Sequence, residues 1–281
     1  NFTKWDNQPG SPEAVMDALL RAAQIAQTAP RGPVYVNFEV AMQEEKIGAL
    51  PPLPDAARYP VPPAARPAAE LVAAAAKLLS GAKHPVILAG RCSRSLDGWK
   101  ARVALAEKLN APVLTNIKLA AAFPTDHRLH AAPPGASLTP EARALVAASD
   151  VILALDWLDL AGTLKQACEA KPVAAKVIQV SCDAHSHRGW SMDHQGLPPV
   201  DLYLLCETDA AVPLLLGATD ARRASAALPE APPLPPVPDA VSLRGVGAAL
   251  EDATRGIDVC YTRLPLGWNG AYAQFRHPLD Y

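Results

Sequence analysis

The residues best suited to hold a phosphate group lie in the segment 89–95, which reads Ala-Gly-Arg-Cys-Ser-Arg-Ser and follows a short apolar run. Gly90 permits a sharp turn after a strand, and the backbone N–H groups at the start of the next helix suit an anion, with Arg91 as a further donor. Neither GxGxxG nor GxxxxGK(S/T) occurs in the chain. An ordinary strand-to-helix turn is therefore the favoured interpretation, and a phosphate site is the alternative.

A second candidate site lies in the segment 181–188, where Cys182 and Asp183 precede a His-x-His pair and His194 follows nearby. Imidazoles at this spacing can chelate zinc, with a thiolate or carboxylate as a further ligand. No second spaced pair completes a tetrahedral set, and polar residues after a strand commonly cap helices. No metal ligand is therefore assigned.

Nucleophiles and paired carboxylates give no stronger signal. No GxSxG motif is present, and the acids at Glu44-Glu45 and at Asp156 and Asp159 are typical of solvated faces or helix caps. The five cysteines lie mostly in or beside apolar segments, which predicts buried and inert thiols. No catalytic residue is assigned.

The composition excludes several classes of protein. The 281 residues carry a net charge of −2, so there is no electrostatic reason to expect a nucleic acid or an anionic membrane as a partner. No apolar run reaches the roughly 18 residues of a membrane span. Five cysteines without a CxxC pair indicate a reducing compartment. We expect a globular cytoplasmic protein.

Five short apolar runs alternate with helical patterns between the two ends of the chain. Runs without polar alternation are typical of parallel strands covered on both faces. The expected strands are 85–89, 111–115, 151–155, 176–180 and 201–205, and further strands are expected at 34–38 and 257–261. This order predicts an α/β fold, a Rossmann-like doubly wound parallel sheet with partial α/β flanking domains.

Proline, with 29 residues, is about twice as frequent as usual and concentrates in two belts. Pro-rich segments are extended and semi-rigid, so residues 51–66 and 221–240 are predicted linkers. A ligand for an SH3-like partner is the alternative. The linkers separate one complete domain, 67–220, from shorter flanks at 1–50 and 241–281. We expect the chain to be an internal piece of a longer polypeptide.

Short motifs in order along nearly the whole chain are Thr3-Lys4-Trp5, the segments 12–15, 23–26 and 31–36, the central 84–90, 105–113 and 149–153, and the rear 264–270 and 277–280. The ordered set resembles thiamine diphosphate-dependent enzymes of the acetolactate synthase type. The resemblance identifies 1–50 as the end of the pyrimidine-binding domain, 67–220 as the central domain and 241–281 as the opening of the diphosphate-binding domain.

The resemblance implies chemistry next to a carbonyl group. In such enzymes the thiazolium carbanion attacks a 2-oxo acid-like substrate, and the ring then serves as the electron sink for decarboxylation or carboligation. It also implies thiamine diphosphate and Mg²⁺ as cofactors and a homodimer or homotetramer as the assembly. The family's activating glutamate and its Gly-Asp-Gly metal motif are expected outside this chain, in which no GDG occurs. The fragment alone is expected to be inactive.

The resemblance also implies cofactor contacts. In the rear flank, Leu266, Gly267, Trp268, Asn269 and Gly270 fall where the family begins to touch thiamine diphosphate, with plain loop packing as the alternative.

In the central domain, Gly90, Arg91, Asn116 and Asp183 match regions that contact FAD in acetolactate synthases and ADP in oxalyl-CoA decarboxylases. Leu155-Asp156-Trp157 stands where Gly-Ala-Arg is usual in the flavin pattern, so bound FAD is not predicted.

Two other functions stay open. One is a nucleotide-binding domain, for NAD, ADP or FAD, of another enzyme class such as the NAD-dependent deacylases. The glycine and acidic fingerprint expected of that class is not supplied by the sequence around Gly90. The other is a structural domain without catalysis, which only joins and orients its neighbours.

Overall fold

The structure is a computed structural model that describes residues 3–49, 52–169, 171–183, 194, 196–221, 236–261 and 270–281. The chain divides between Ala65 and Arg66 into two compact units, and Cys182 and Asp183 group with the first of them. Within the described residues, no helix is both long and apolar enough to cross a membrane.

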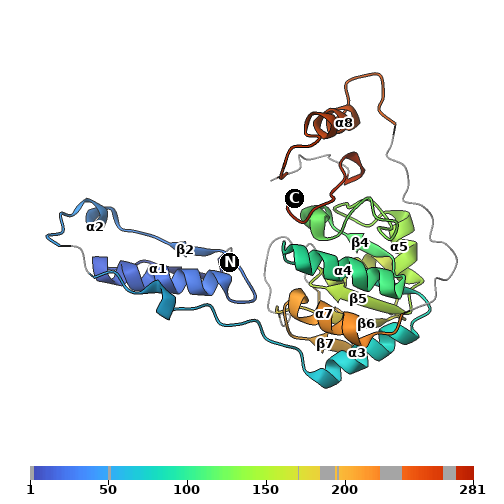
Figure 1. The fold of residues 1–281 in the computed structure, drawn as a ribbon, viewed down its shortest axis with the longest axis horizontal. Coiled ribbons are helices and arrows are strands. Elements are labelled where there is room, and N and C mark those ends of the chain that lie inside the picture. The colour runs from blue at the N-terminus through green and yellow to red at the C-terminus, as the bar shows by residue number, and fades with distance from the viewer. Residues whose placement is uncertain are drawn as a thin grey trace. The chain divides into compact units, whose positions relative to one another are not determined.

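The first unit is built on one β-α-β motif (Figure 1). Ser11 caps the start of its long helix. The Ser11 hydroxyl accepts a hydrogen bond of 3.2 Å from the Ala14 N–H, and Pro12 occupies the first turn. The two strands pair in parallel with Trp5 opposite Val34. The elements are β1 (Trp5–Asn7), α1 (Pro12–Gln27), β2 (Val34–Val36), α2 (Val40–Glu44) and η1 (Ala56–Arg58).

The second unit contains a five-stranded, wholly parallel sheet with the order β4-β3-β5-β6-β7. This confirms the predicted α/β doubly wound fold. The elements are α3 (Ala69–Gly81), β3 (Pro85–Ala89), α4 (Leu96–Leu109), β4 (Val113–Thr115), η2 (Ile117–Ala122), α5 (Pro140–Ala147), β5 (Val151–Leu155), α6 (Leu160–Ala167), β6 (Lys176–Val180), β7 (Leu202–Leu204), α7 (Thr208–Ala218), α8 (Leu243–Ala253) and η3 (Gly270–Tyr272).

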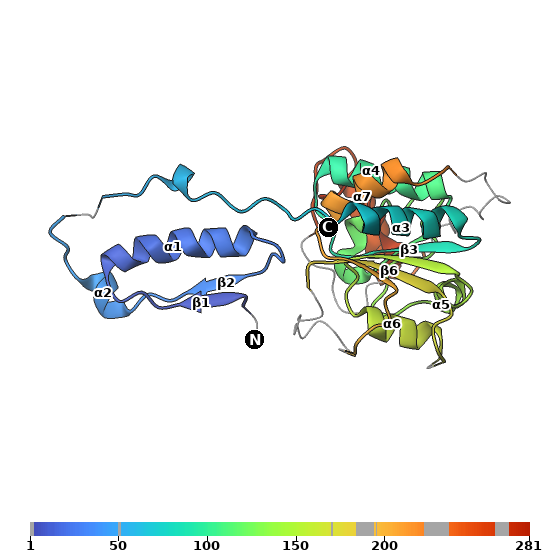
Figure 2. The same cartoon turned by 90° about the horizontal axis from the view of Figure 1, so that it is seen from below.

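Helices cover both faces of the sheet (Figure 2), with α3, α4 and α7 on one face and α5 and α6 on the other. Successive residues of a strand point to opposite faces, so Ile87 and Leu153 join the first layer while Leu88 and Ile152 join the second. All four side chains are at most 2% exposed. The continuous apolar runs of the sequence thus correspond to strands that are buried on both sides.

Several boundaries differ from the predicted ones. Three strands are shorter than expected: β2, β4 and β7. The strand expected at 257–261 is wrong, since the structure assigns no strand there. A strand needs a neighbour to pair with, and in that stretch Tyr261 donates a backbone hydrogen bond to the loop residue Asp280.

Candidate functional site

The order of the strands reverses between β3 and β5, because β4 lies on one side of β3 and the chain then continues on the other side. In open parallel sheets, ligands bind at such a point, outside the carboxyl ends of the strands. The residues that follow these two strands are Gly90 and Arg91 after β3, and Asp156 and Trp157 after β5. The reversal point therefore contains two of the site residues predicted from the sequence.

The backbone N–H groups after β3 already have acceptors within the protein. Gly90 donates to the Leu155 carbonyl oxygen at 2.9 Å, and Arg91 donates to the Asp156 carbonyl oxygen at 2.9 Å. The N–H of Cys92 donates to the Gly90 carbonyl oxygen at 2.7 Å. A phosphate bound by these groups would have to replace all three bonds.

Gly90 is required by the close approach of the β5–α6 loop. A Cβ atom at this position would overlap the carbonyl oxygen of Asp156 and lie 2.5 Å from the Cα of Trp157. The glycine thus brings two protein segments together, whereas the phosphate-site interpretation used it to admit a ligand.

The side chains of Arg91 and Asp156 form an ion pair in which Nη2 lies 2.8 Å from Oδ1. The two side chains are only 26% and 19% exposed. Asp156 has a φ of 52°, in the left-handed region, and so has Asp159, which caps α6 by accepting a hydrogen bond from the Gly162 N–H at 3.2 Å. Residues other than glycine rarely adopt this left-handed conformation, and here two of them lie on either side of Trp157 in one short loop.

A buried polar cluster lies beside this point and was missed by the sequence analysis. Arg102 is 2% exposed and donates to the carbonyl oxygens of Ala122 at 3.0 Å and of Ser93 at 3.1 Å. Its Nη1 lies 3.6 Å from Oδ1 of Asp209, whose other carboxylate oxygen accepts from the Ser93 hydroxyl. Arg102 stands on α4, and nothing in the sequence of this helix indicates that one of its charged residues is buried.

Cys92 lies next to this cluster. Burial raises the pKa of its thiol, and the positive charge of Arg102 offsets only part of this effect. The sequence predicted mostly buried thiols, but only Cys206 is buried, while Cys92, Cys168 and Cys182 are partly buried and Cys260 is exposed.

The other two predicted nucleotide contacts occupy different places. Asn116 follows β4 as Gly90 follows the neighbouring β3, since Ala89 pairs with Thr115. The Asn116 side chain, however, caps η2 by accepting a hydrogen bond of 2.8 Å from the Lys118 N–H. Asp183 lies three residues beyond the end of β6 and groups with the first unit. The structure thus brings Gly90 and Arg91 together with Asp156.

The predicted thiamine diphosphate loop is described only at its last residue. Leu266, Gly267, Trp268 and Asn269 lie outside the described residues, as do the two histidines of the His-x-His pair. Gly270 begins η3 and is buried, and a Cβ atom there would lie 2.6 Å from Cγ of Pro134.

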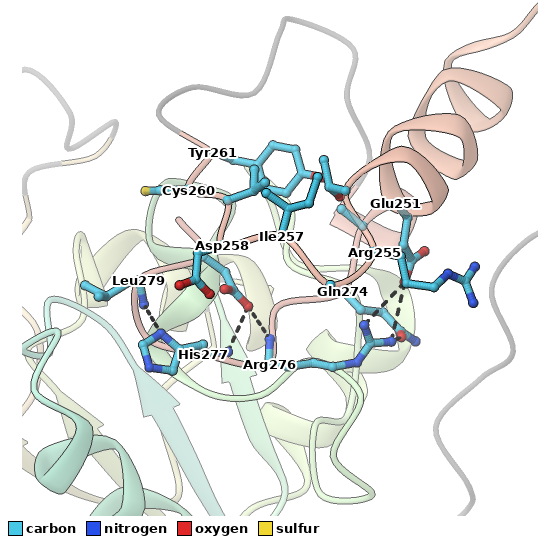
Figure 3. A pocket seen from close by; sticks show the side chains of 15 residues that line it. Glu251, Arg255, Ile257, Asp258, Cys260, Tyr261, Gln274, Arg276, His277 and Leu279 are labelled. Carbon is cyan, nitrogen blue, oxygen red and sulfur yellow. Dashed lines mark hydrogen bonds and ion pairs between the residues drawn. The ribbon is translucent and has the colours of Figure 1, made fainter.

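A pocket of about 740 Å³ opens beside this segment (Figure 3), between the end of α8, residues 256–261 and residues 273–280. Arg276 crosses it and contacts Glu251 at 3.4 Å, Gln274, and Asp126 of the central domain at 2.7 Å. Burial alone would lower the pKa of Arg276, but Asp126 and Glu251 raise it.

The polar groups of this pocket are largely engaged within the protein. Oδ2 of Asp280 accepts from the backbone N–H groups of Arg276 at 2.6 Å and His277 at 2.8 Å. Among the residues that the structure describes, no group of three or more His, Cys, Asp or Glu side chains could hold a metal ion. No catalytic step is assigned to the described residues of this pocket.

The fold and its reversal point define an α/β domain of the doubly wound type. Residues 72–190 match the family model of the thiamine pyrophosphate enzyme central domain, thiamine pyrophosphate being another name for thiamine diphosphate. The resemblance seen in the sequence is therefore confirmed for this part of the chain.

The sequence is similar to parts of two known enzymes. A sulfoacetaldehyde acetyltransferase of Alcaligenes xylosoxydans xylosoxydans is 42% identical over 118 residues, which are 41% of this chain and 19% of the relative. An acetolactate synthase large subunit of Corynebacterium glutamicum is 30% identical over 154 residues, which are 54% of this chain and 24% of the relative. The matched part is thus a minor share of each relative.

Solved structures match almost the whole chain in fold. A benzoylformate decarboxylase from Polynucleobacter necessarius has a TM-score of 0.74 at 22% identity, covering 99% of this chain and 51% of that one. A thiamine diphosphate-dependent 4-hydroxybenzoylformate decarboxylase from Rhodococcus jostii has a TM-score of 0.71 at 21% identity, covering 99% and 52%. This chain therefore spans about half the length of these proteins, and the likeness concerns the fold alone.

Proposed function

We propose that the chain is part of a thiamine diphosphate- and Mg²⁺-dependent enzyme that decarboxylates or ligates a 2-oxo acid-like substrate. The observation that carries the proposal is the match of residues 72–190 to the central domain of thiamine pyrophosphate enzymes. The names of the relatives support it, because they describe an acetyltransferase, an acetolactate synthase and decarboxylases. Such reactions make or break a bond next to a carbonyl carbon, for which the cofactor provides an electron sink.

The proposal assigns the cofactor site to the parent protein rather than to this chain alone. Residues 266–270 would touch the cofactor, and the activating glutamate and Gly-Asp-Gly motif would come from other parts of the polypeptide. The sequence contains no GDG, and the engaged polar groups around Arg276 support the same view. We also propose a homodimer or homotetramer and a cytoplasmic location for the parent protein.

Within that enzyme, we propose that the central domain has a structural role. The support is that the Gly90 and Arg91 N–H groups donate hydrogen bonds to carbonyl oxygens of the protein and that Gly90 packs closely against the β5–α6 loop. Binding of ADP or FAD through Gly90, Arg91, Asn116 and Asp183 stays the alternative, as does a nucleotide-binding domain of another enzyme class. Such binding would require the β5–α6 loop to move away from β3.

The test compares this chain with a parent protein that includes the activating glutamate and the Gly-Asp-Gly motif. Thiamine diphosphate and Mg²⁺ are titrated into each by calorimetry, and CO₂ release and carboligation products are measured with pyruvate and with benzoylformate. We expect cofactor binding and turnover by the parent only. A parent protein that binds no thiamine diphosphate would refute the proposal.

A thermal-shift series with ADP, NAD and FAD on the 281-residue chain tests the structural role. We expect no increase in Tm with any of the three ligands. A rise that grows with ligand concentration would instead assign a nucleotide site to the central domain.

A further inference from the structure

We infer that Thr125 and Asp126, in the connection between β4 and α5, are positioning residues that fix the opening of the diphosphate-binding domain against the central domain. The inference rests on the proposed function for the meaning of that segment, but its contacts lie wholly within the second unit. Four contacts join the central domain to residues 270–281.

The first contact is apolar. Phe275 is 0% exposed and packs in a small cluster with Trp99 of α4 and with Ala120 and Ala121 of η2. Tyr261 meets the Phe275 ring edge to face at a centroid distance of 6.2 Å. This cluster shares Val103 with the core on the α4 side of the sheet, and it holds the rear segment to α4 and η2.

The second contact sets the register of the segment. The Thr125 N–H donates to the Phe275 carbonyl oxygen at 2.9 Å, and the Phe275 N–H donates to the Thr125 hydroxyl at 2.8 Å. A shift of the segment by one residue would break both bonds and would remove the Phe275 ring from its cluster. The pair therefore selects one alignment of two segments that are 150 residues apart in the sequence.

The third contact is electrostatic. Nε of Arg276 lies 2.7 Å from Oδ2 of Asp126, while the same guanidinium reaches Glu251 of α8 at 3.4 Å. The Arg276 side chain is 54% exposed, so the individual ion pairs are screened and modest in strength. Their combined effect is to connect α8, the rear segment and the central domain through one side chain, which Figure 3 shows reaching toward Glu251 and Gln274.

The fourth contact explains why this docking concerns the cofactor. Gly270 is the last residue of the loop that the resemblance assigns to thiamine diphosphate, and it lies so close to Pro134 that a Cβ atom would sit 2.6 Å from the proline Cγ. One end of that loop is thus held against the β4–α5 connection. The central domain would thereby place the loop for the cofactor without touching the cofactor itself.

The test uses Thr125→Val, which keeps the shape of the side chain but removes the acceptor for the Phe275 N–H. Thr125→Ser is the rescue variant, because it keeps the hydroxyl. Thr163→Val is the matched control, since Thr163 accepts a hydrogen bond of 2.8 Å from Trp157 Nε1 and lies on α6, on the opposite face of the sheet from α4.

Hydrogen exchange of the 281-residue chain reports the docking without any cofactor. In Thr125→Val we expect the amide of Phe275 to exchange about five- to tenfold faster, as the loss of one buried hydrogen bond implies, while the amides of Ile152 and Leu153 are unchanged. Thr125→Ser and Thr163→Val should leave the Phe275 rate as it is. Exchange of the Phe275 amide at the rate of an unstructured peptide in the unmodified chain would overturn the inference.

Titration of thiamine diphosphate with Mg²⁺ into the parent protein reports the positioning. We expect the cofactor Kd to rise about tenfold in Thr125→Val, to return in Thr125→Ser and to stay constant in Thr163→Val. An unchanged Kd in Thr125→Val, despite faster exchange at Phe275, would overturn the positioning role. A parent that binds no cofactor in any form would refute the proposed function, and the exchange experiment would still decide whether the segment docks.

Discussion

Nη2 of Arg91 lies 2.8 Å from Oδ1 of Asp156, so that an ion pair joins the ends of β3 and β5 where the strand order reverses. Doubly wound sheets commonly bind ligands at this place. Here the same place is occupied by the protein's own side chains and by backbone hydrogen bonds from Gly90 and Arg91. These bonds connect the loop after β3 to the loop after β5.

Replacement of Gly90 by alanine should destabilise the second unit. The added methyl group would overlap the Asp156 carbonyl oxygen, which belongs to the backbone and cannot rotate away. Overpacking of this kind costs about 2–3 kcal/mol, which urea denaturation would measure as a lower midpoint at the same slope. Gly81→Ala is the control, since nothing lies within 4 Å of its Cβ position, and it should leave the midpoint unchanged or raise it. Equal midpoints for the two variants would show that the loops separate easily.

The ion pair between Arg91 and Asp156 should be measurable by a double-mutant cycle with Arg91→Met and Asp156→Asn. Asparagine tolerates the left-handed conformation of residue 156, so the cycle removes the charge without adding backbone strain. We expect a coupling energy of about 1 kcal/mol, because the pair is shielded from solvent. The helix pair of Asp17 and Arg21, with side chains 68% and 58% exposed, should give about 0.3 kcal/mol. A smaller coupling at Arg91 than at Arg21 would contradict this interpretation.

The buried Arg102 should be essential for the stability of the second unit. Its removal in Arg102→Met would leave the Ser93 and Ala122 carbonyl oxygens without their donor and would leave the Asp209 carboxylate without its nearest cation. We expect a loss of about 3 kcal/mol in the free energy of unfolding. Arg128→Met removes an exposed arginine whose bond to Asn110 Oδ1 is 3.2 Å long, and it should cost less than about 0.5 kcal/mol. Similar losses in both variants would argue against a special role for Arg102.

The sheet was predictable from the sequence because its strands are apolar on both faces and are short and β-branched. β3, β5 and β6 have the predicted bounds, and Thr139 begins α5 as its capping pattern indicates. The helix starts follow from bonds within three residues, such as that of the Ser11 hydroxyl to the Ala14 N–H. Local signals of this kind do not depend on how distant segments meet.

The contacts at the site could not be predicted in the same way, because they join distant segments. Asp156 approaches Arg91 across 65 residues, and Thr125 meets Phe275 across 150. A glycine after a strand looks the same in a sequence whether it admits a phosphate or another loop. The strand expected at 257–261 failed for a related reason, since an apolar run becomes a strand only when a partner strand lies beside it.

His130 should make the second unit sensitive to acid. The pKa of its imidazole is lowered to about 4, mainly by burial and also by the positive charge of His127, which Asp126 and the Thr125 backbone only partly oppose. The ring forms a hydrogen bond of 2.9 Å between Nε2 and the Thr115 hydroxyl, and it stacks on Phe123.

The sign of the effect follows from the two pKa values of His130. Above pH 6.5 the imidazole is neutral in both the folded and the unfolded chain, so the full stability is present. Between pH 6.5 and about 4 the unfolded chain takes up a proton that the folded chain excludes, and the free energy of unfolding falls. The total loss is about 3 kcal/mol once the pH lies below both values.

Urea denaturation of the unmodified chain and of His130→Gln at pH 7, 6, 5 and 4 would measure this loss. Glutamine keeps a polar group near Thr115 but takes up no proton, so its stability should fall less steeply with acid. The carboxylates of Asp150 and Asp201, whose pKa values are lowered, also cost stability at low pH. They are present in both proteins, and the difference between the two curves therefore isolates His130. Parallel curves would mean that His130 accepts a proton in the folded state without cost, which requires water to reach the ring between β4 and Phe123.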